Sequence, residues 1–352
     1  GIILKRHEDF PNSSKLDIHV VKKTDKLNLG NFQIEFFHVN HNIPDSVGVV
    51  LRTPEGVIVH TGDFKFDHSP IGDEPADLAR IVNIATQPGG VLAMLSDSTN
   101  AEVPGYTISE KQVQEALDEI IKQAEGRVIA ATFGSLISRI QQLINIAEKY
   151  GRKLAVDGYT MRTNVEISRE LGFLTTKKDT FVPIKDINKY PPEKILIACT
   201  GAQGEGEAVL MRIANKEHRQ VHIQRGDSVI FSSSVVPGNE RSVSSLKDIL
   251  MYQGAKIFHS KLMDVHASGH ASVEDLKLML NLVKPKFLIP IHGNHFMLRM
   301  HGQVAESVGM LPENVLILGN GKPVIFKDQK AHIIQERVPS NYVMVDGLGI
   351  GD

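Results

Sequence analysis

The sequence predicts an α/β protein in which one unit of sheet and helices is inserted into another sheet. Three observations support this prediction: residues 32–95 contain β-rich runs joined by tight turns, residues 109–283 alternate helices with strands, and one apolar strand returns at residues 286–291. Strands that alternate with helices of this length favour a parallel sheet with helices on both faces. A mostly antiparallel sheet, then an α/β unit, then a short return is typical of an inserted domain.

The first region is predicted to contain four strands, at residues 32–39, 47–51, 57–60 and 91–95. Asn-Ile-Pro-Asp, Pro-Glu-Gly and Gly-Asp signals separate them, and these favour tight turns. In the second region, Ser109 can cap a helix because Gln112 lies three residues later, and that helix should end at Gly126. The elements that follow are strands at 128–132, 153–156, 194–199, 228–231 and 286–291, and helices at 135–150, 162–171, 207–215, 241–252 and 273–283. Residues 174–193 should form a surface connection.

The composition is that of an ordinary globular protein and excludes several classes. Of 352 residues, 41% are hydrophobic, and no apolar run approaches the roughly 20 residues that span a bilayer. The single cysteine, Cys199, excludes an internal disulfide and suits a reducing compartment, so we expect a cytoplasmic protein. A net charge of -2 argues against coating of nucleic acid by bulk charge but leaves room for a local basic channel. Both ends look interrupted, so we expect an excerpt of a longer protein, truncated at both ends.

Three polar side chains at the ends of predicted strands could bind a metal ion. His41 precedes a proline turn, Asp63 lies in a Thr-Gly-Asp turn, and His292 stands between an apolar strand and a glycine. Imidazole and carboxylate suit zinc or manganese, and each oxygen of a carboxylate can bind one cation. Taken alone, each residue could instead stabilise its own turn. Three ligands could hold one ion but are too few for a two-metal site.

The segment from His266 to Ala271 offers groups that bind phosphate. It supplies two imidazoles, a hydroxyl and the backbone N–H of a glycine, and a predicted helix start follows it. Such groups can grip a phosphate or protonate a leaving oxygen. For His266 the alternative is a capped helix start with an incidental histidine. Asp97, at the end of the strand 91–95, could orient a catalytic histidine or cap its turn.

In this order, these motifs resemble the β-CASP branch of the metallo-β-lactamase superfamily, and the ribonuclease J family in particular. The resemblance covers nearly the whole chain, and the motifs are specific jointly rather than singly. They are His41 in Val-Asn-His-Asn-Ile-Pro-Asp-Ser, Asp63 in His-Thr-Gly-Asp-Phe-Lys, Asp97 in Ser-Asp-Ser-Thr-Asn-Ala-Glu, the run Thr-Gly-Ala-Gln-Gly-Glu at 200–205, His270 in His-Ala-Ser-Gly-His-Ala-Ser, and His292 in Pro-Ile-His-Gly.

The resemblance implies a metallo-β-lactamase αββα sandwich, its N-terminal part missing, with an inserted β-CASP α/β domain. The expected domains are the first part of the metallo-β-lactamase domain at 1–105, the β-CASP domain at 106–284, a return segment at 285–336, and a linker at 337–352 towards a missing C-terminal domain.

The resemblance also implies roles for the site residues. His41 would bind one of two divalent ions, zinc or manganese; Asp63 would bridge both and His292 would bind the second. His270 would act near the leaving group as general acid, with Asp97 orienting it. The groups that contact RNA phosphates would be Ser135, His266, Ser268, Gly269, His270 and Ala271.

The implied function is a metal-dependent ribonuclease, with 5′-to-3′ exonuclease and endonuclease activity in RNA processing, including that of rRNA, and in RNA decay. Its partner would be RNA, preferably 5′-monophosphorylated, with no membrane involved. The full-length protein would be a homodimer or homotetramer.

The sequence departs from the family at three places. The leading signature His-x-His-x-Asp-His, which supplies four ligands, does not occur in this chain, so the metal site would be partial and the excerpt alone inactive. Leu136 and Ser138 stand where relatives usually carry polar or histidine side chains. Asn294 stands where an acidic residue often follows His-Gly.

Two alternatives remain from other functional classes. One is a non-catalytic RNA-binding or partner subunit of the same fold that has lost its metal site. The other is a hydrolase for a small ester, lactam or thioester. The long insertion argues against the second, because a small substrate needs no separate clamping domain.

Overall fold

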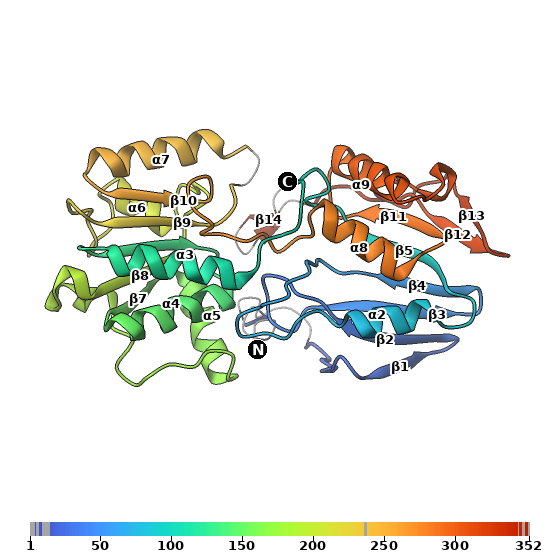
Figure 1. Cartoon of the computed structure of the whole chain (residues 1–352), viewed down its shortest axis with the longest axis horizontal. Helices are drawn as coiled ribbons and strands as arrows, with labels where there is room; N and C mark the ends of the chain where they lie inside the picture. The colour runs from blue at the N-terminus through green and yellow to red at the C-terminus, as the bar shows by residue number, and fades with distance from the viewer. Residues whose placement is uncertain are drawn as a thin grey trace.

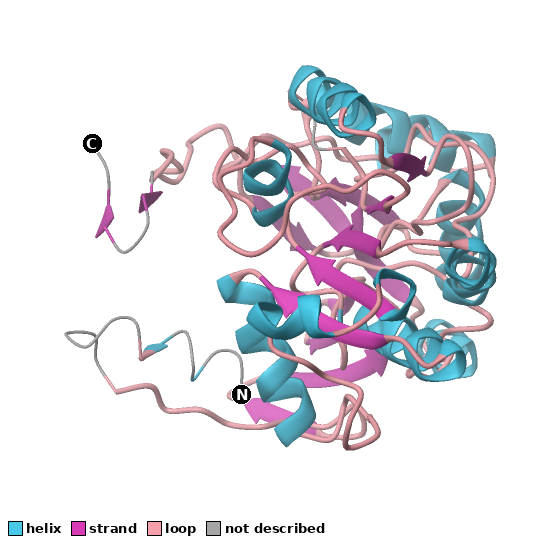
Figure 2. Cartoon of the chain, turned by 90° about the vertical axis from the view of Figure 1, so that its left-hand side faces the viewer, coloured by secondary structure: helices cyan, strands magenta, loops and turns pink. Residues whose placement is uncertain are grey.

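A computed structural model of the chain describes residue 4 and residues 7–8, 15–235, 238–343, 345–346 and 349–350. The strands of these residues form two large sheets and two hairpins. The two sheets lie side by side along the long axis of the molecule (Figure 1). Strands occupy the middle of the body and helices lie around them (Figure 2). No described helix combines the length and the apolar character that crossing a membrane requires.

The first sheet has six strands in the order β1-β2-β3-β4-β5-β11. The pairs β1–β2, β2–β3 and β3–β4 are antiparallel, which agrees with the mostly antiparallel region that was predicted, although β1 itself was not predicted. In contrast, β5 lies parallel to β4, and β11 lies parallel to β5. A parallel neighbour needs a crossover, and α2 (Leu78–Ala85) provides it between β4 and β5. Helix α2 was not predicted from the sequence. The strands are β1 (Lys26–Leu29), β2 (Phe32–His38), β3 (Val47–Thr53), β4 (Gly56–His60), β5 (Val91–Asp97) and β11 (Phe287–Ile291).

The second sheet is entirely parallel, in the order β10-β9-β6-β8-β7, with an apolar core on each face. The predicted parallel sheet covered by helices on both faces is therefore confirmed. Ser109 caps α3 in a capping box with Gln112, also as predicted. The strands are β6 (Val128–Thr132), β7 (Lys153–Asp157), β8 (Ile195–Cys199), β9 (Ser228–Ser232) and β10 (Lys256–His259). The helices are α3 (Glu110–Gln123), α4 (Ile137–Tyr150), α5 (Tyr159–Glu170), α6 (Val209–Ala214) and α7 (Glu240–Tyr252).

After β10 the chain returns to the first sheet. Helix α8 (Val273–Val283) packs with α2 in the core of that sheet, and α9 (His295–Ser307) follows β11. We therefore propose that the inserted unit, expected at 106–284, ends before α8. The remaining elements are short: the hairpins β12 (Val324–Lys327) with β13 (Lys330–Ile333) and β14 (Val345–Asp346) with β15 (Gly349–Ile350), and the 3₁₀ turns η1 (Ile184–Lys189), η2 (Pro192–Lys194) and η3 (Pro312–Asn314).

The chain crosses between the two units at a single junction. It leaves the first sheet at the carboxyl end of β5 and comes back after the carboxyl end of β10 (Figure 1). Loops at the carboxyl ends of parallel strands are where ligands usually bind in α/β folds. Side chains from the ends of β4, β5 and β11 therefore meet the loop that leaves the second sheet.

Candidate functional site

Four side chains with metal-binding groups meet at the junction. Asp63 follows β4, Asp97 ends β5, His292 follows β11, and His270 lies in the loop that enters α8. One ligand atom from each lies within 4.8 Å of those of the other three. The parallel pairing of β4, β5 and β11 explains this meeting, because it brings three carboxyl ends to the same edge of the sheet.

Asp97 is the centre of the cluster. One of its carboxylate oxygens, Oδ2, lies 2.7 Å from Nδ1 of His270, and the other, Oδ1, lies 3.3 Å from Nδ1 of His292. Only 1% of its surface is exposed. Burial alone would raise the pKa of Asp97, but the hydrogen bonds from the two histidines hold that pKa well below its usual range. Asp97 is therefore ionised and fixes the orientation of both rings.

His292 is held on a strained backbone. Its φ is +54°, which non-glycine residues adopt rarely. Thr99 links this turn to Asp97, because its hydroxyl lies 2.7 Å from Oδ1 of Asp97, 3.1 Å from the His292 carbonyl oxygen and 3.0 Å from Nδ1 of the His292 ring. The ring also lies 3.3 Å from Oδ1 of Asp63. The hydrogen bond to Asp97 raises the pKa of His292.

His41 approaches the cluster from the end of β2. Its Nδ1 donates to the Gly269 carbonyl at 2.8 Å, and burial lowers its pKa, so the ring is neutral. This bond leaves the Nε2 lone pair free, 4.0 Å from Oδ2 of Asp63. Gly269 is required here, since a Cβ at this position would lie 2.7 Å from Nδ1 of His41 and from Cγ of Asn42.

The loop that carries His270 is held by hydroxyl and amide groups. Asn100 donates to the Ser268 hydroxyl at 2.7 Å and to the His270 carbonyl at 3.1 Å, and Thr107 donates to that carbonyl at 3.0 Å. Ala271 is buried in the core of the first sheet, so its backbone alone remains for a ligand. The loop is therefore preorganised beside the cluster.

The two other candidate phosphate-binding residues lie nearer the second sheet. His266 is neutral, because burial and the nearby Arg139 charge lower its pKa to about 3. Its Nδ1 has no hydrogen-bond partner among the described residues. Ser135 is exposed in the turn that joins β6 to α4. Neither residue belongs to the four-residue cluster.

The donor set fits a divalent metal ion. Both carboxylate oxygens of Asp97 are engaged by hydrogen bonds, whereas the Asp63 carboxylate is partly exposed and faces the rings of His41 and His292. Two imidazoles and a carboxylate are the donors that zinc and manganese prefer. His41, Asp63 and His292 could therefore hold an ion, with Asp97 and His270 alongside it.

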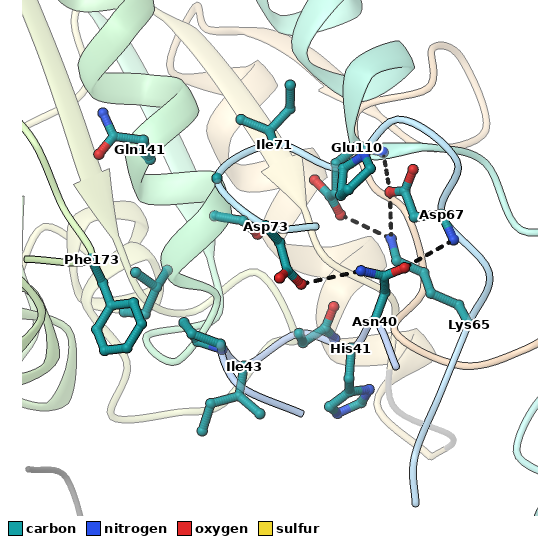
Figure 3. Close-up of a pocket in the computed structure, with 16 residues that line it drawn as sticks. Asn40, His41, Ile43, Lys65, Asp67, Ile71, Asp73, Glu110, Gln141 and Phe173 are labelled. Carbon is teal, nitrogen blue, oxygen red and sulfur yellow. Dashed lines mark hydrogen bonds and ion pairs between the residues drawn. The ribbon is translucent and has the colours of Figure 1, made fainter. Parts of the chain in front are cut away.

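A pocket opens beside His41 between the two units (Figure 3). Loop residues of the first unit face α4 and Phe173 of the second across it. Lys65 lies on its wall between Asp67 and Glu110, and Asn40 is bonded to Asp73 (Figure 3). Its other lining residues include Ile43, Ile71, Ile137, Ser138 and Gln141. Two of the residues that depart from the family pattern can now be placed. Ser138 lines this pocket, and Leu136 is fully buried and packs in the core.

Sequence reasoning missed several residues of the site. Thr99 and Asn100 stand in the motif that flagged Asp97, so their position beside it was a usable signal. Lys65 likewise stands in the motif that flagged Asp63. Glu110 and Arg139 carried no signal, because charged residues are usually exposed and these two are buried.

The comparisons with known proteins agree on one family. A model described as "Ribonuclease J, beta-CASP domain" matches residues 125–250, and one described as "Zn-dependent metallo-hydrolase RNA specificity domain" matches residues 260–317. The chain is 42% identical to Ribonuclease J 1 of Streptococcus pyogenes over 95% of its own length and 59% of the relative's. It is 39% identical to Ribonuclease J2 of Bacillus subtilis, and 41% identical to Ribonuclease J of Thermus thermophilus, over its whole length and 63% and 61% of theirs. The chain thus spans about three fifths of these relatives.

A solved structure shares the fold. It is a protein of unknown function from Enterococcus faecalis, with a TM-score of 0.62 and 16% identity, and the match covers 94% of this chain and 72% of that one.

Proposed function

We infer, from the premise that this chain belongs to the ribonuclease J family, that it forms the larger part of a metal-dependent nuclease that cleaves RNA. One observation carries the proposal. An ionised, buried carboxylate orients two imidazoles within 4.8 Å of a second carboxylate, at the junction of two units that could enclose a polymer.

In the proposed mechanism, His41, Asp63 and His292 help to hold two divalent ions, zinc or manganese, in the full-length protein. When bound, these ions supply an activated water and stabilise the charge that develops on the phosphate. His270 provides a proton for the leaving oxygen. Its Nδ1–H is held by Asp97, so its Nε2 is the atom that faces substrate.

The RNA phosphates would be bound by the loop 266–271 and the turn at Ser135. Ser268, Gly269 and Ala271 offer a hydroxyl and backbone N–H groups, and His266, being neutral, can only donate one N–H. We propose a preference for 5′-monophosphorylated RNA and both 5′-to-3′ exonuclease and endonuclease activity. We also propose that the protein acts in the cytoplasm, in RNA decay and rRNA processing, as a homodimer or homotetramer.

The test uses the intact gene product with manganese or zinc and 5′-monophosphorylated RNA. Wild type should cleave the RNA, and the double variant Asp63→Ala/His292→Ala should not, because two donors are removed. Glu240→Ala, at the exposed start of α7, is the control and should cleave like wild type. Cleavage that survives the double substitution contradicts the proposal. RNA binding without any cleavage by wild type would favour the non-catalytic alternative.

A further inference from the structure

The largest fully buried side chain in the described part of the chain is a cation, Arg139 on α4. Its Nη2 donates to Oε2 of Glu110 at 2.9 Å. Its Nη1 donates to the Val265 carbonyl at 2.8 Å and to the Ser232 hydroxyl. The Ser232 hydroxyl in turn donates to the same carbonyl at 2.6 Å, so the Val265 carbonyl accepts two hydrogen bonds.

Glu110, at the start of α3, links this guanidinium to the first unit. Its Oε1 accepts from Nζ of Lys65 at 3.3 Å, and Lys65 also lies 3.5 Å from Oδ2 of Asp67. The backbone N–H of Glu110 donates to the same Asp67 oxygen at 2.8 Å. Burial would raise the pKa of Glu110, but Arg139 and Lys65 lower it to about 2. Two cations and two carboxylates thus form a neutral, buried network across the junction.

The network ends on both sides at the candidate site. Lys65 is two residues from Asp63, and its backbone N–H donates to the Asn40 carbonyl, beside His41. Val265 immediately precedes the loop that carries His266 and His270. Arg139 therefore connects the strand ends of the first sheet with the loop from the second.

A buried ionic network of this kind contributes little net stability, because desolvation offsets most of the attraction. Well-packed apolar side chains would stabilise the junction as well. What the charges add is a defined geometry, since each group has its partners at one relative placement of the units.

We propose that Arg139 is a positioning residue, which sets the place of the loop 266–270 over the cluster by holding the Val265 carbonyl, and so sets where His270 lies relative to Asp97. This proposal rests on the proposed function for its effect on cleavage, but its geometric content does not.

The test is Arg139→Lys in the intact gene product loaded with manganese. Lysine keeps the buried charge but carries its donors on one nitrogen, so it lacks the planar fork with which Nη1 and Nη2 bond the Val265 carbonyl and Glu110 separately. We expect a roughly 10- to 100-fold lower kcat with little change in KM, because small displacements of a reacting group have effects of this size. The metal content should stay that of wild type, and the ring ¹⁵N resonances of His270, recorded on the protein loaded with diamagnetic zinc instead, should shift.

The matched control is Arg152→Lys. Arg152 is also buried, but its guanidinium donates to the carbonyls of Gly126, Ala124, Ile121 and Ile195, all within the second unit. It should lose stability without shifting the His270 resonances or lowering kcat per folded molecule. If Arg139→Lys does not fold, Ser232→Ala removes one of the two bonds to Val265 without unpairing a charge. Ser232→Ala should shift the His270 resonances in the same direction as Arg139→Lys does, but by less.

Two outcomes overturn the proposal: His270 resonances unchanged in the position 139 and 232 variants, or equal changes in the Arg152 control. A wild-type protein that does not cleave RNA would contradict the proposed function instead. The resonance comparison would still decide the role of Arg139.

Discussion

Two aspartate–histidine pairs in this molecule have the same short oxygen-to-nitrogen distance and differ in what surrounds the histidine ring. In the first, which we call the open pair, Asp97 ends β5 and lies 2.7 Å from Nδ1 of His270. In the second, the closed pair, Asp157 ends β7 and lies 2.7 Å from Nε2 of His218. Each aspartate is the last residue of a parallel strand and is nearly buried.

The difference lies at the other nitrogen of each ring. In the closed pair, Nδ1 of His218 accepts the backbone N–H groups of Gln220 and Val221 at 3.2 and 3.0 Å, so the ring has no group to offer. In the open pair, Nε2 of His270 makes no hydrogen bond within the described part of the chain. The centroid of the His270 ring lies 4.9 Å from the centroid of the His41 ring. An aspartate–histidine pair can do chemistry only where the second nitrogen remains available.

The largest effect should come from breaking the open pair. Asp97→Asn removes the charge that orients His270 and His292, and we expect cleavage by the intact gene product to fall by roughly 10²–10⁴-fold, the usual contribution of a positioned acid or base. The measurement is kcat on 5′-monophosphorylated RNA with manganese. Activity within a few-fold of wild type would remove Asp97 from the mechanism.

Breaking the closed pair should cost stability and leave activity alone. Asp157 accepts hydrogen bonds from His218, Arg162 and the Gly158 N–H, so Asp157→Asn should lower the free energy of unfolding by about 2 kcal/mol. Denaturant unfolding measures this loss, and kcat per folded molecule should stay within about twofold of wild type. A large loss of kcat would contradict the view that the closed pair has only a structural role.

A glycine beside the open pair should show how closely its loop must approach. Gly269→Ala places a Cβ 2.7 Å from Nδ1 of His41, so the loop must move, and we expect roughly a tenfold loss of kcat. Gly206→Ala is the matched control, because a Cβ there meets nothing within 4 Å. Equal kcat in the two variants would show that the loop tolerates displacement.

Lowering the pH should remove the contribution of the open pair to folding stability, and this effect should be smaller than those above. The pKa of Asp97 is lower in the folded protein than its ordinary 3.8, so the unfolded chain binds its proton first as pH falls. The stabilisation is fully present above about pH 4–5 and is lost in strong acid, with a slope of at most about 1.4 kcal/mol per pH unit. The stability difference between metal-free wild type and Asp97→Asn should therefore shrink as pH falls from 6 to 3. A constant difference would contradict this assignment.

The sequence was informative about the elements and less so about their pairing. The alternation of residues 109–283 predicted the parallel sheet because helix and strand periods are local properties. Helix α2 was missed because the run before it, 70–77, is rich in Gly, Pro and acidic residues typical of a loop. The β12–β13 hairpin was also missed, and so was α9, although Asn294 caps it by accepting the Met297 N–H at 3.0 Å.

The same limit applies to the site. His41, Asp63, Asp97 and His292 could be named in advance because each stands at or just after the end of an apolar run. His270 could be named because it lies among phosphate-binding groups just before a helix start. That Asp97 bonds two of these histidines could not be derived from the residues, since those partners are 173 and 195 positions away. Apart from the family resemblance of the motif around Asp97, nothing in the residues separated Asp97 from Asp157, because the bonds that satisfy His218 come from backbone N–H groups.

The hydrogen bond from Nδ1 of His41 to the Gly269 carbonyl joins the first unit to the chain leaving the second. An ion bound at Nε2 of His41 would favour the arrangement in which this bond is made, and thermodynamic linkage makes that arrangement favour the ion equally. Ion occupancy and closure of the junction would then share one equilibrium. The apparent affinity for the ion would report the population of molecules whose two units are closed together.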